Sequence, residues 1–388
     1  MNKKNFICGV AVGALSVSII FGAFNIYMLK ASGFTKEDKI AYISQLLNEY
    51  YVDDIDNEKL FESAYAGLVA GVGDPYTTYM SKDEFEDFMS SSNGEFGGIG
   101  VGVLFNDKNK TVYVSYVTEG SPAESAGIRP GDKIVEINGE SVSDMDSDTV
   151  ANKIRGPQGT SVDILIYRQS DNENHSFTIK RDIIDIQSVK GEIINGDIGY
   201  IYISGFKNNT YDQFMNAYNN LSEQGIRGLI IDVRDNPGGL LTSVVKIADE
   251  IIPEGNVVYT IDKEGNRKDF NADPNYIDIP MVMLVNGNSA SASEILAGAF
   301  QDRGRGKLVG TQTFGKGLVQ NLYKIPDGSA VKITIEKYYT PKGVCIQGIG
   351  ITPDYIVENE SDLASVQLIP HSEDTQLIEA VRVLESEM

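Results

Sequence analysis

The sequence predicts an α/β protein with a small β-rich domain inserted ahead of its main core. From residue 183 to about residue 360, strand patterns alternate with amphipathic helix patterns, which is typical of a sheet with largely parallel strands. Between residues 95 and 182, the pattern changes to short strands separated by turn residues. The length of 388 residues also favours two or three domains.

The N-terminal segment predicts a membrane anchor. Residues 1–5 include Lys3 and Lys4, and residues 6–29 contain no charged side chain. A helix of that length spans about 36 Å, enough for a bilayer core of about 30 Å. Basic residues on the short side favour a cytoplasmic tip, so we expect a single-pass membrane protein with an extracytoplasmic body. The alternative is a signal peptide cleaved near residues 31–33, which would give a secreted body.

Residues 34–92 predict a helical region. Apolar side chains recur at helical spacing from Ile40 to Tyr50, the Asp74-Pro75 pair ends a second helix, and residues 82–89 form a short third. We expect these helices to form a small packing or dimerisation layer.

The β-rich domain, residues 95–182, contains a strong hairpin signal at Asn138-Gly139, because both central residues of that turn need a positive φ. The glycines of residues 96–103 run into a strand and not a helix, which argues against a dinucleotide loop. Such a loop can instead bind a peptide carboxylate through backbone N–H groups. The strand patterns lie at residues 101–105, 111–117 and 161–168.

The main core, residues 183–360, is followed by a helical tail, residues 361–388, with an amphipathic pattern at 375–387. Strand patterns in the core lie at residues 198–206, 228–235 and 280–285. Helix patterns lie at residues 210–225, 240–252 and 291–304.

Composition excludes several classes of function. The net charge of −22 argues against a nucleic-acid partner, which would require clustered Lys and Arg. Cys8 and Cys345 are far apart in sequence and environment, so we expect no disulfide, and we expect Cys345 to be a packing residue. No metal or cofactor is implied.

A serine and a lysine are the candidate reacting groups. Ser291 follows a buried strand at the start of a helix, where free N–H groups can stabilise an oxyanion. The alternative is an ordinary capping box with Glu294. The two histidines of the chain lie outside glycine- or serine-rich turns, so we expect Lys316, in an uncharged stretch, to act as the base. The alternative is a turn lysine.

Two further positions carry weaker signals. Gln320 lies four residues after Lys316, so in a regular strand the two would share a face and could hydrogen-bond. Gly238 and Gly239 follow a buried strand and could bring backbone N–H groups close to a substrate oxygen. The alternatives are an ordinary polar strand residue and a simple strand-to-helix turn.

Taken together, these segments resemble the C-terminal processing peptidases, also called tail-specific proteases. The resemblance covers nearly the whole chain after residue 34, with all motifs in family order. The matching segments are GDPYTTYM, GEFGGIGVGV, SPAESAGIRPGDKIVEINGE, IDVRDNPGG, VNGNSASASEI, GTQTFGKGLVQ and YYTPKGVCIQGIGITPD, followed by the tail helix.

The resemblance implies a PDZ domain inserted before a protease core of the crotonase/ClpP-like class. It implies that Ser291 is the nucleophile, Lys316 the general base, and Gln320 the residue that positions the lysine. It also implies an oxyanion hole from the backbone N–H groups of Gly238 and Ala292.

For the PDZ domain, the resemblance implies that a loop binds the C-terminus of a substrate, and that Arg168 couples this domain to the core. The residues of that loop are Gly98, Ile99, Gly100 and Val101.

The predicted function is that of a serine endopeptidase that cleaves proteins at or from their C-terminal side, gated by the PDZ domain. Its expected partners are substrates with free C-termini, the membrane, and a second copy of the chain in a homodimer. Two alternatives remain open. One is a PDZ scaffold with an inactive peptidase core, and the other is an acyl-CoA enzyme, because crotonases share the core class.

Overall fold

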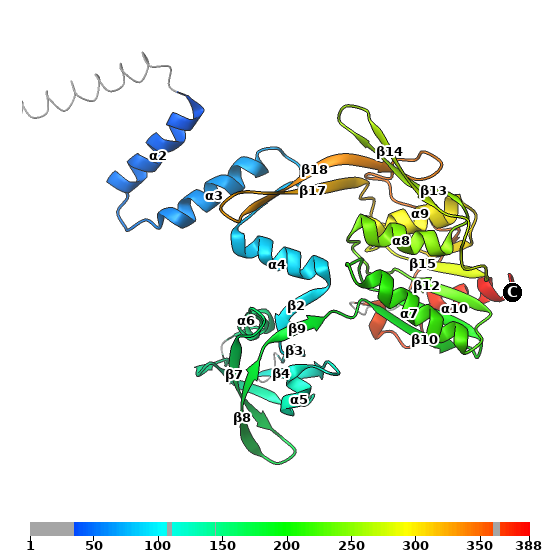
Figure 1. Cartoon of the computed structure of the whole chain (residues 1–388), viewed down its shortest axis with the longest axis horizontal. Helices are drawn as coiled ribbons and strands as arrows, with labels where there is room; N and C mark the ends of the chain where they lie inside the picture. The colour runs from blue at the N-terminus through cyan, green and yellow to red at the C-terminus, as the bar shows by residue number, and fades with distance from the viewer. Residues whose placement is uncertain (1–34, 107–110, 144, 360–364) are drawn as a thin grey trace, which may run out of the picture. The chain divides into compact units, whose positions relative to one another are not determined.

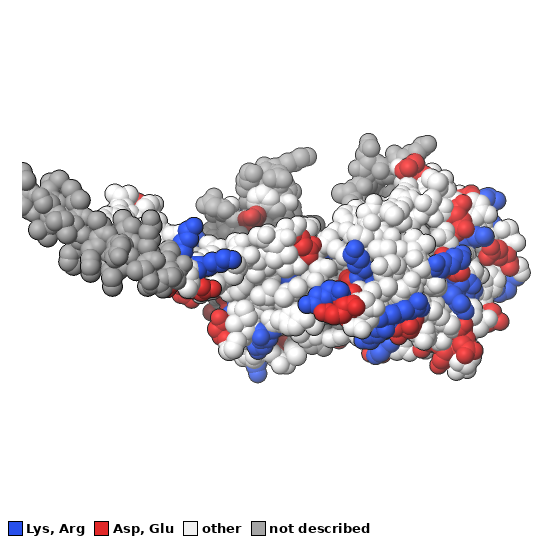
Figure 2. Space-filling view, turned by 90° about the horizontal axis from the view of Figure 1, so that it is seen from above, with Lys and Arg blue, Asp and Glu red and all other residues white. Residues whose placement is uncertain are grey.

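The computed structural model divides into two compact units, residues up to Gly71 and residues from Val72 to Met388. Acidic and basic side chains are interspersed on the face drawn in Figure 2. The residues that the structure describes are 35–106, 111–143, 145–359 and 365–388.

The predicted membrane anchor, residues 6–29, and the tip, residues 1–5, lie outside the described residues. Across the part of the chain that is described, no helix combines the length and apolar character needed to cross a membrane.

The first unit consists of helices α2 (Lys36–Tyr50) and α3 (Asn57–Ala70), as the helical pattern predicted. α2 begins at a capping box, in which Thr35 Oγ1 accepts from Asp38 N–H at 3.1 Å and the Asp38 carboxylate accepts from Thr35 N–H at 2.8 Å. The Asp56 side chain caps α3. Neither helix has a fully buried side chain, so apolar residues on both remain accessible.

A six-stranded sheet forms the centre of the main core, with helices α7 (Thr210–Glu223), α8 (Leu241–Ile251) and α10 (Thr375–Glu385) beside it (Figure 1). Its neighbouring strands are parallel except for the first pair, as the alternation of strands and helices predicted. Its order is β10 (Val189–Ile194), β11 (Ile198–Ile203), β12 (Gly228–Asp232), β15 (Met281–Val285), β16 (Lys307–Gly310) and β19 (Tyr355–Ile356).

Helices cover both faces of this sheet because its central strands are apolar on both sides. Ile201, Leu229 and Ile231 pack with α7, α8 and α9 (Ala292–Asp302). The alternate side chains Tyr200 and Ile230 pack with the tail helix α10. The short 3₁₀ helix Val366–Leu368 precedes α10.

A second, five-stranded sheet differs from the largely parallel layer that the sequence predicted, because all its pairings are antiparallel. The β1–β18 pair joins the segment around Thr78 to the core. Helix α4 (Lys82–Asn93) follows directly and leads towards the β-rich domain. The strands are β1 (Thr78–Met80), β18 (Ala330–Tyr339), β13 (Gly255–Asp262), β14 (Arg267–Ala272) and β17 (Leu318–Lys324).

The β-rich domain is a mixed sheet-and-helix body with its own apolar core. Asn138 and Gly139 have φ values of 52° and 77°, which confirms the predicted hairpin turn between β5 and β6. The first and last strands of the domain, β2 and β9, pair with each other as a two-stranded antiparallel ribbon. The elements are β2 (Glu95–Gly98), β3 (Val101–Asn106), β4 (Thr111–Val117), α5 (Pro122–Ala126), β5 (Lys133–Ile137), β6 (Glu140–Ser141), α6 (Ser147–Ile154), β7 (Ser161–Arg168), β8 (Glu173–Lys180) and β9 (Asp182–Asp185).

A buried ion cluster fastens the tail helix to the central sheet. The Arg234 side chain, 1% exposed, bonds Asp232 at 2.6 Å and Asp374 at 2.7 Å. Asp374 also accepts from the N–H of Leu377 in the first turn of α10. Asp232 accepts the Tyr200 hydroxyl at 2.7 Å, and burial together with this carboxylate raises the pKa of Tyr200.

Removing the cation of this cluster should destabilise the protein strongly. Arg234→Met would leave the carboxylates of Asp232 and Asp374 buried without their counter-ion, and we expect a loss of about 3–5 kcal/mol in unfolding free energy. Urea denaturation followed by circular dichroism measures the loss. The control is Arg227→Met, because Arg227 pairs with Asp197 at the surface, where a loss below about 1 kcal/mol is expected. Equal losses in the two variants would contradict this account.

Candidate active site

Ser291 occupies a strained turn between β15 and α9. Its φ of 56° and ψ of −111° lie in a region that a residue with a Cβ rarely adopts. The Ser291 N–H donates to the Glu294 carboxylate at 2.8 Å, which stabilises this backbone. Helix α9 begins at Ala292, with Ser291 at the N-cap position, so the predicted helix start is confirmed.

The turn after β12 touches Ser291. A Cβ placed on Gly238 would lie 2.9 Å from the Ser291 Cβ and 3.0 Å from the Ala292 nitrogen. Gly238 also has a φ of 105°, so glycine is needed for both reasons. The two turns that the sequence singled out separately thus form one surface.

The free N–H groups of this surface differ in part from those expected. The Gly238 N–H donates to Asn236 Oδ1 at 2.8 Å and is occupied in this conformation. Within the described residues, the N–H groups of Gly239 and Ala292 donate no hydrogen bond. Ala292 therefore offers the donor that the resemblance implied, and of the two glycines that the sequence singled out, Gly239 rather than Gly238 has the free N–H in this conformation.

The Lys316 amine lies near the Ser291 turn but interacts elsewhere. Both residues line one groove. The Lys316 Nζ lies 4.6 Å from the ring centroid of Tyr76, and in the described part of the chain no hydrogen bond joins it to Ser291 Oγ. Catalytic hydrogen bonds are often absent from structures without substrate, so the lack of a bond between Lys316 and Ser291 does not argue against the pair.

The charges around Lys316 act in opposite directions. Burial lowers the pKa of Lys316, and the neighbouring Lys332 lowers it further. Asp74 and Glu294 raise the pKa of Lys316, against these two effects. A lowered pKa increases the fraction of neutral amine, the form that can accept a proton.

Gln320 is not bonded to Lys316 in this structure. Its Nε2 donates to Thr334 Oγ1 at 3.4 Å. Lys316 precedes β17, which begins at Leu318, and the register of β17 against β18 shifts between Val319 and Gln320, so the rule that alternate residues share a face does not apply to this pair. Gln320 nevertheless lines the same groove as Ser291 and Lys316.

The buried carboxylate of Glu294 connects the two loops. Its Oε2 accepts from the N–H groups of Ser291 and Lys316, each at 2.8 Å. Its Oε1 accepts from the Thr313 hydroxyl at 2.6 Å and from the Gly315 N–H at 2.7 Å. The sequence marked Glu294 only as a capping residue, although an acidic residue within the apolar run of α9 was a signal of such a role.

Tyr338 makes a second connection between the same loops. Its hydroxyl donates to the Lys316 carbonyl at 2.6 Å and lies 3.0 Å from the Ser291 carbonyl. Burial raises the pKa of Tyr338 well above its usual range, so the hydroxyl keeps its proton. Nothing in the local sequence marks this tyrosine, because it comes from the antiparallel sheet.

The groove around Ser291 has a volume of about 780 Å³, which is in the range of ligand sites. Much of its wall is apolar and suits an extended peptide. The lining includes Phe88, Met89, Phe206, Leu240, Leu241, Ile295, Leu318, Val319 and Leu322.

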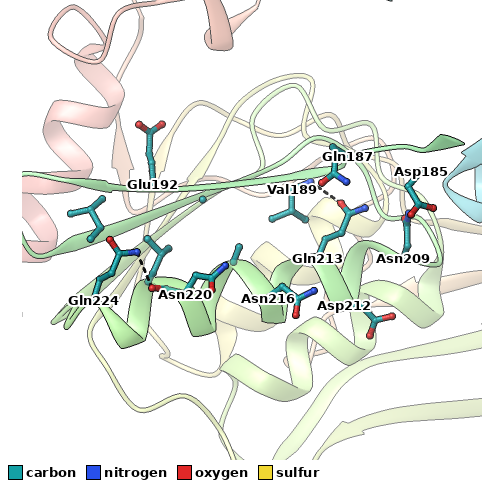
Figure 3. Close-up of a pocket in the computed structure, with 14 residues that line it drawn as sticks. Asp185, Gln187, Val189, Glu192, Asn209, Asp212, Gln213, Asn216, Asn220 and Gln224 are labelled. Carbon is teal, nitrogen blue, oxygen red and sulfur yellow. Dashed lines mark hydrogen bonds between the residues drawn. The ribbon is translucent and has the colours of Figure 1, made fainter. Parts of the chain in front are cut away.

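A second hollow of about 840 Å³ lies between β10 and α7 (Figure 3). Amide side chains such as Asn216 and Gln213 line it, together with acidic residues. None of its lining residues is a serine, cysteine, lysine or histidine, so it has no counterpart of the Ser291 and Lys316 pair.

In the β-rich domain, the loop from Gly98 to Val101 leads into β3, an edge strand of its sheet. An edge strand can pair with an added peptide. The Ile99 side chain is fully buried in the domain core, which leaves its backbone as the part that could meet a peptide. Gly100 has a φ of 83°, and a Cβ there would lie 2.4 Å from the Ser121 Cβ.

Arg168 forms contacts within its own domain. Its guanidinium donates two hydrogen bonds to Asp132, at 2.8 and 2.7 Å, and one to the Gly127 carbonyl at 2.8 Å. The bonds to Asp132 raise the pKa of Arg168. All three hydrogen bonds of the Arg168 side chain stay within the β-rich domain, and none reaches the core as expected.

The site combines a strained serine, a lysine with a lowered pKa and two free N–H groups. This set can support attack of a hydroxyl on a carbonyl and stabilisation of the resulting oxyanion. Among the residues that the structure describes, no group of three His, Cys, Asp or Glu side chains is placed to hold a metal ion.

Models of known protein families match three parts of the chain. Residues 197–357 match peptidase family S41, residues 113–168 match a PDZ domain, and residues 27–84 match the N-terminal domain of the activating protease CtpB.

Relatives match over most of their length. A carboxyl-terminal-processing protease from Synechocystis sp. is 35% identical, with 89% of this chain and 87% of that protein covered. A carboxy-terminal-processing protease from Bartonella bacilliformis is 35% identical, with 91% and 82% covered. Among solved structures, a photosystem II D1 C-terminal processing protease matches at 30% identity with a TM-score of 0.50, covering 89% and 90% of the two chains. Identity at this level over most of both chains shows that this protein belongs to the carboxyl-terminal processing protease family, serine peptidases of family S41 that here carry a PDZ domain.

Proposed function

We propose that this peptidase cleaves protein substrates at or near their C-termini, with Ser291 as nucleophile and Lys316 as general base. One observation carries the assignment of the residues. The Glu294 carboxylate holds the backbone N–H groups of both at 2.8 Å, so the two loops face one groove in a fixed relation. The rival idea of an inactive scaffold is not favoured, because each reacting residue and its supports are present.

In the proposed reaction, Lys316 in its neutral form accepts the proton of the Ser291 hydroxyl while Oγ attacks the scissile carbonyl carbon. The oxyanion accepts hydrogen bonds from the Ala292 N–H and from a backbone N–H of the turn at Gly238 and Gly239. The protonated lysine then gives its proton to the leaving amine. Water then attacks the acyl group on Ser291, and Lys316 accepts the proton of the water. The lysine passes this proton to Ser291 Oγ as the acyl group leaves.

The Lys316 amine must leave the Tyr76 ring to reach Ser291. We propose that substrate binding brings about this movement, and that Gln320 then bonds the amine and orients it. The PDZ domain contributes by binding the substrate's C-terminus at the edge of β3, beside the loop Gly98–Val101. Arg168 is proposed to take part in coupling this domain to the core.

The remaining parts of the proposal concern location and assembly. We propose a core of the crotonase/ClpP-like class, held outside the cell membrane by the anchor at residues 6–29. Apolar side chains such as Ile43 and Leu68, exposed on α2 and α3, support pairing of two chains through these helices.

Loss of either reacting residue should abolish hydrolysis. We expect Ser291→Ala and Lys316→Ala to lower kcat/KM by about 10³-fold or more, and Gln320→Ala by about 10²-fold. The measurement uses a fluorogenic peptide, with circular dichroism to verify folding. The control is Lys324→Ala, an exposed lysine of β17, which should retain the wild-type rate. Full activity of Lys316→Ala would refute the dyad.

Glu294→Gln should lower kcat although its shape is nearly unchanged. The new amide NH₂ would face N–H donors, leaving two of the four buried donors without an acceptor. We expect kcat to fall by about 10²-fold, as for a group that orients reacting residues. Glu192→Gln, an exposed acid on β10, serves as the control. A kcat within threefold of wild type would show that the carboxylate does not orient the dyad.

The midpoint of the pH–rate profile should shift in opposite directions in two variants. The rate should rise with pH as Lys316 loses its proton. Lys332→Met removes a charge that lowers the pKa of Lys316, so the midpoint should move to higher pH. Asp74→Asn removes a charge that raises the pKa of Lys316, so the midpoint should move to lower pH. Profiles of kcat/KM between pH 6 and about 10 measure both shifts. Coincident profiles for the three proteins would exclude Lys316 as the titrating base.

A further inference from the structure

The groove at Ser291 is lined by positive charge, although the chain as a whole is acidic. Three lysines, Lys207, Lys316 and Lys332, line it, and no aspartate or glutamate is among its lining residues. The whole chain has 55 acidic and 33 basic residues. A lining drawn at random from this composition would contain more acids than bases.

The second hollow provides an internal comparison, because its volume of about 840 Å³ is similar. Figure 3 shows the acidic side chains of Asp185, Glu192 and Asp212 around it, and no lysine, arginine or histidine lines it. These two hollows therefore have opposite charge. The lysines of the Ser291 groove do not reflect a general property of the hollows of this molecule.

The groove lysines also lack acidic partners. In the described part of the chain, none of the three amines forms an ion pair or a hydrogen bond with a carboxylate. Lys316 lies over Tyr76, and Lys332 lies 5.6 Å from the ring centroid of Phe88. By contrast, Lys153 on α6 pairs with Glu140 at 2.7 Å. Half-buried amines without an anion leave part of the cost of desolvation uncompensated.

Lys207 is the lysine best placed to bind substrate without taking part in proton transfer. It follows Phe206, whose N–H donates to the Gly238 carbonyl at 2.9 Å, so it stands beside the turn that touches Ser291. Its own N–H donates to Thr210 Oγ1 at 2.8 Å, which fixes the backbone at this point. Burial lowers the pKa of Lys207, and the positive charge of Arg155 lowers it further. A carboxylate beside the amine would offset both effects.

We propose that Lys207 makes the catalytic groove a receptor for a carboxylate of the substrate, foremost the free carboxylate at the end of the peptide tail that is cut off, after that end has left the PDZ loop Gly98–Val101. The proposal rests on the peptidase function proposed above and names its substrate class. Peptides offer carboxylates at the chain end and on Asp or Glu side chains, and both would suit an unpaired amine. A tail whose end lies inside the groove is short, so the groove itself would favour cleavage close to the C-terminus.

The test measures binding and does not depend on turnover. In a first pair of fluorescent peptides with the same apolar sequence, one peptide ends in a free acid and the other in an amide. A second pair carries Asp or Asn within an amidated tail. Their affinity for the full chain carrying Ser291→Ala is measured by anisotropy at low salt. We expect the free acid to bind about tenfold more tightly than the amide, and the preference to weaken as salt screens the charge.

The variants assign this preference to a residue. Lys207→Gln should reduce the ratio of acid to amide affinity towards one, while Lys207→Arg should retain most of it. Lys190→Gln, an exposed lysine of β10, is the matched control and should keep the full ratio. A larger effect of the Asp/Asn pair than of the acid/amide pair would assign the site to an acidic side chain and overturn the terminal assignment.

Two results would overturn the proposal. Equal affinity for acid and amide would show that no carboxylate is bound. An acid preference of the same size in Lys207→Gln as in the parent chain would place the carboxylate elsewhere, for example at the PDZ loop Gly98–Val101. Hydrolysis by the chain with intact Ser291 is measured in parallel. Lack of cleavage would contradict the peptidase function, while the binding ratios would still decide the role of Lys207.

Discussion

The active site depends on one buried carboxylate. Glu294 is fully buried, and its two oxygens accept four hydrogen bonds, from Ser291, Lys316, Gly315 and Thr313. A buried charge without such partners would be strongly unfavourable, so the loops that supply the donors are constrained to meet there. Ser291 and Lys316 belong to different loops of the chain, and this anion makes their backbones part of one structure. From these two residues it accepts backbone N–H groups, so neither the Ser291 hydroxyl nor the Lys316 amine is used in this contact.

The strain at Ser291 is sustained by its surroundings. A positive φ at a serine costs free energy of the order of 1–3 kcal/mol and persists only where the structure imposes it. Here the imposing contacts are the bond to Glu294, the close approach of Gly238 and the Tyr338 hydroxyl near the Ser291 carbonyl. The strained turn holds the Ser291 backbone at the start of α9, beside the free N–H of Ala292. The same contacts explain why residues far from the reacting atoms contribute to the site.

Local patterns predicted most of the parallel sheet and its helices, because the periodicity of apolar residues over β11, β12, α7, α8 and α9 is set within each element. They did not predict the antiparallel sheet, whose pairings join residues as distant as Thr78 and Lys332. They predicted Ser291 and Lys316 as candidate reacting residues but did not mark Tyr338, which that sheet supplies. The expected bond between Gln320 and Lys316 assumed a regular strand, and the register shift at Val319 and Gln320 removes that assumption.

The absence of acidic side chains from the lining of the groove has two consequences that reinforce each other. A carboxylate beside Lys316 would stabilise its charged form and raise its pKa, which would reduce the fraction of neutral base. The two acids that act on Lys316, Asp74 and Glu294, do not line the groove, and Glu294 is already saturated by four donors. The same exclusion leaves Lys207 without a competing anion from the protein. A groove that excludes carboxylates therefore avoids raising the pKa of Lys316, and it also leaves the carboxylate to be supplied by the substrate.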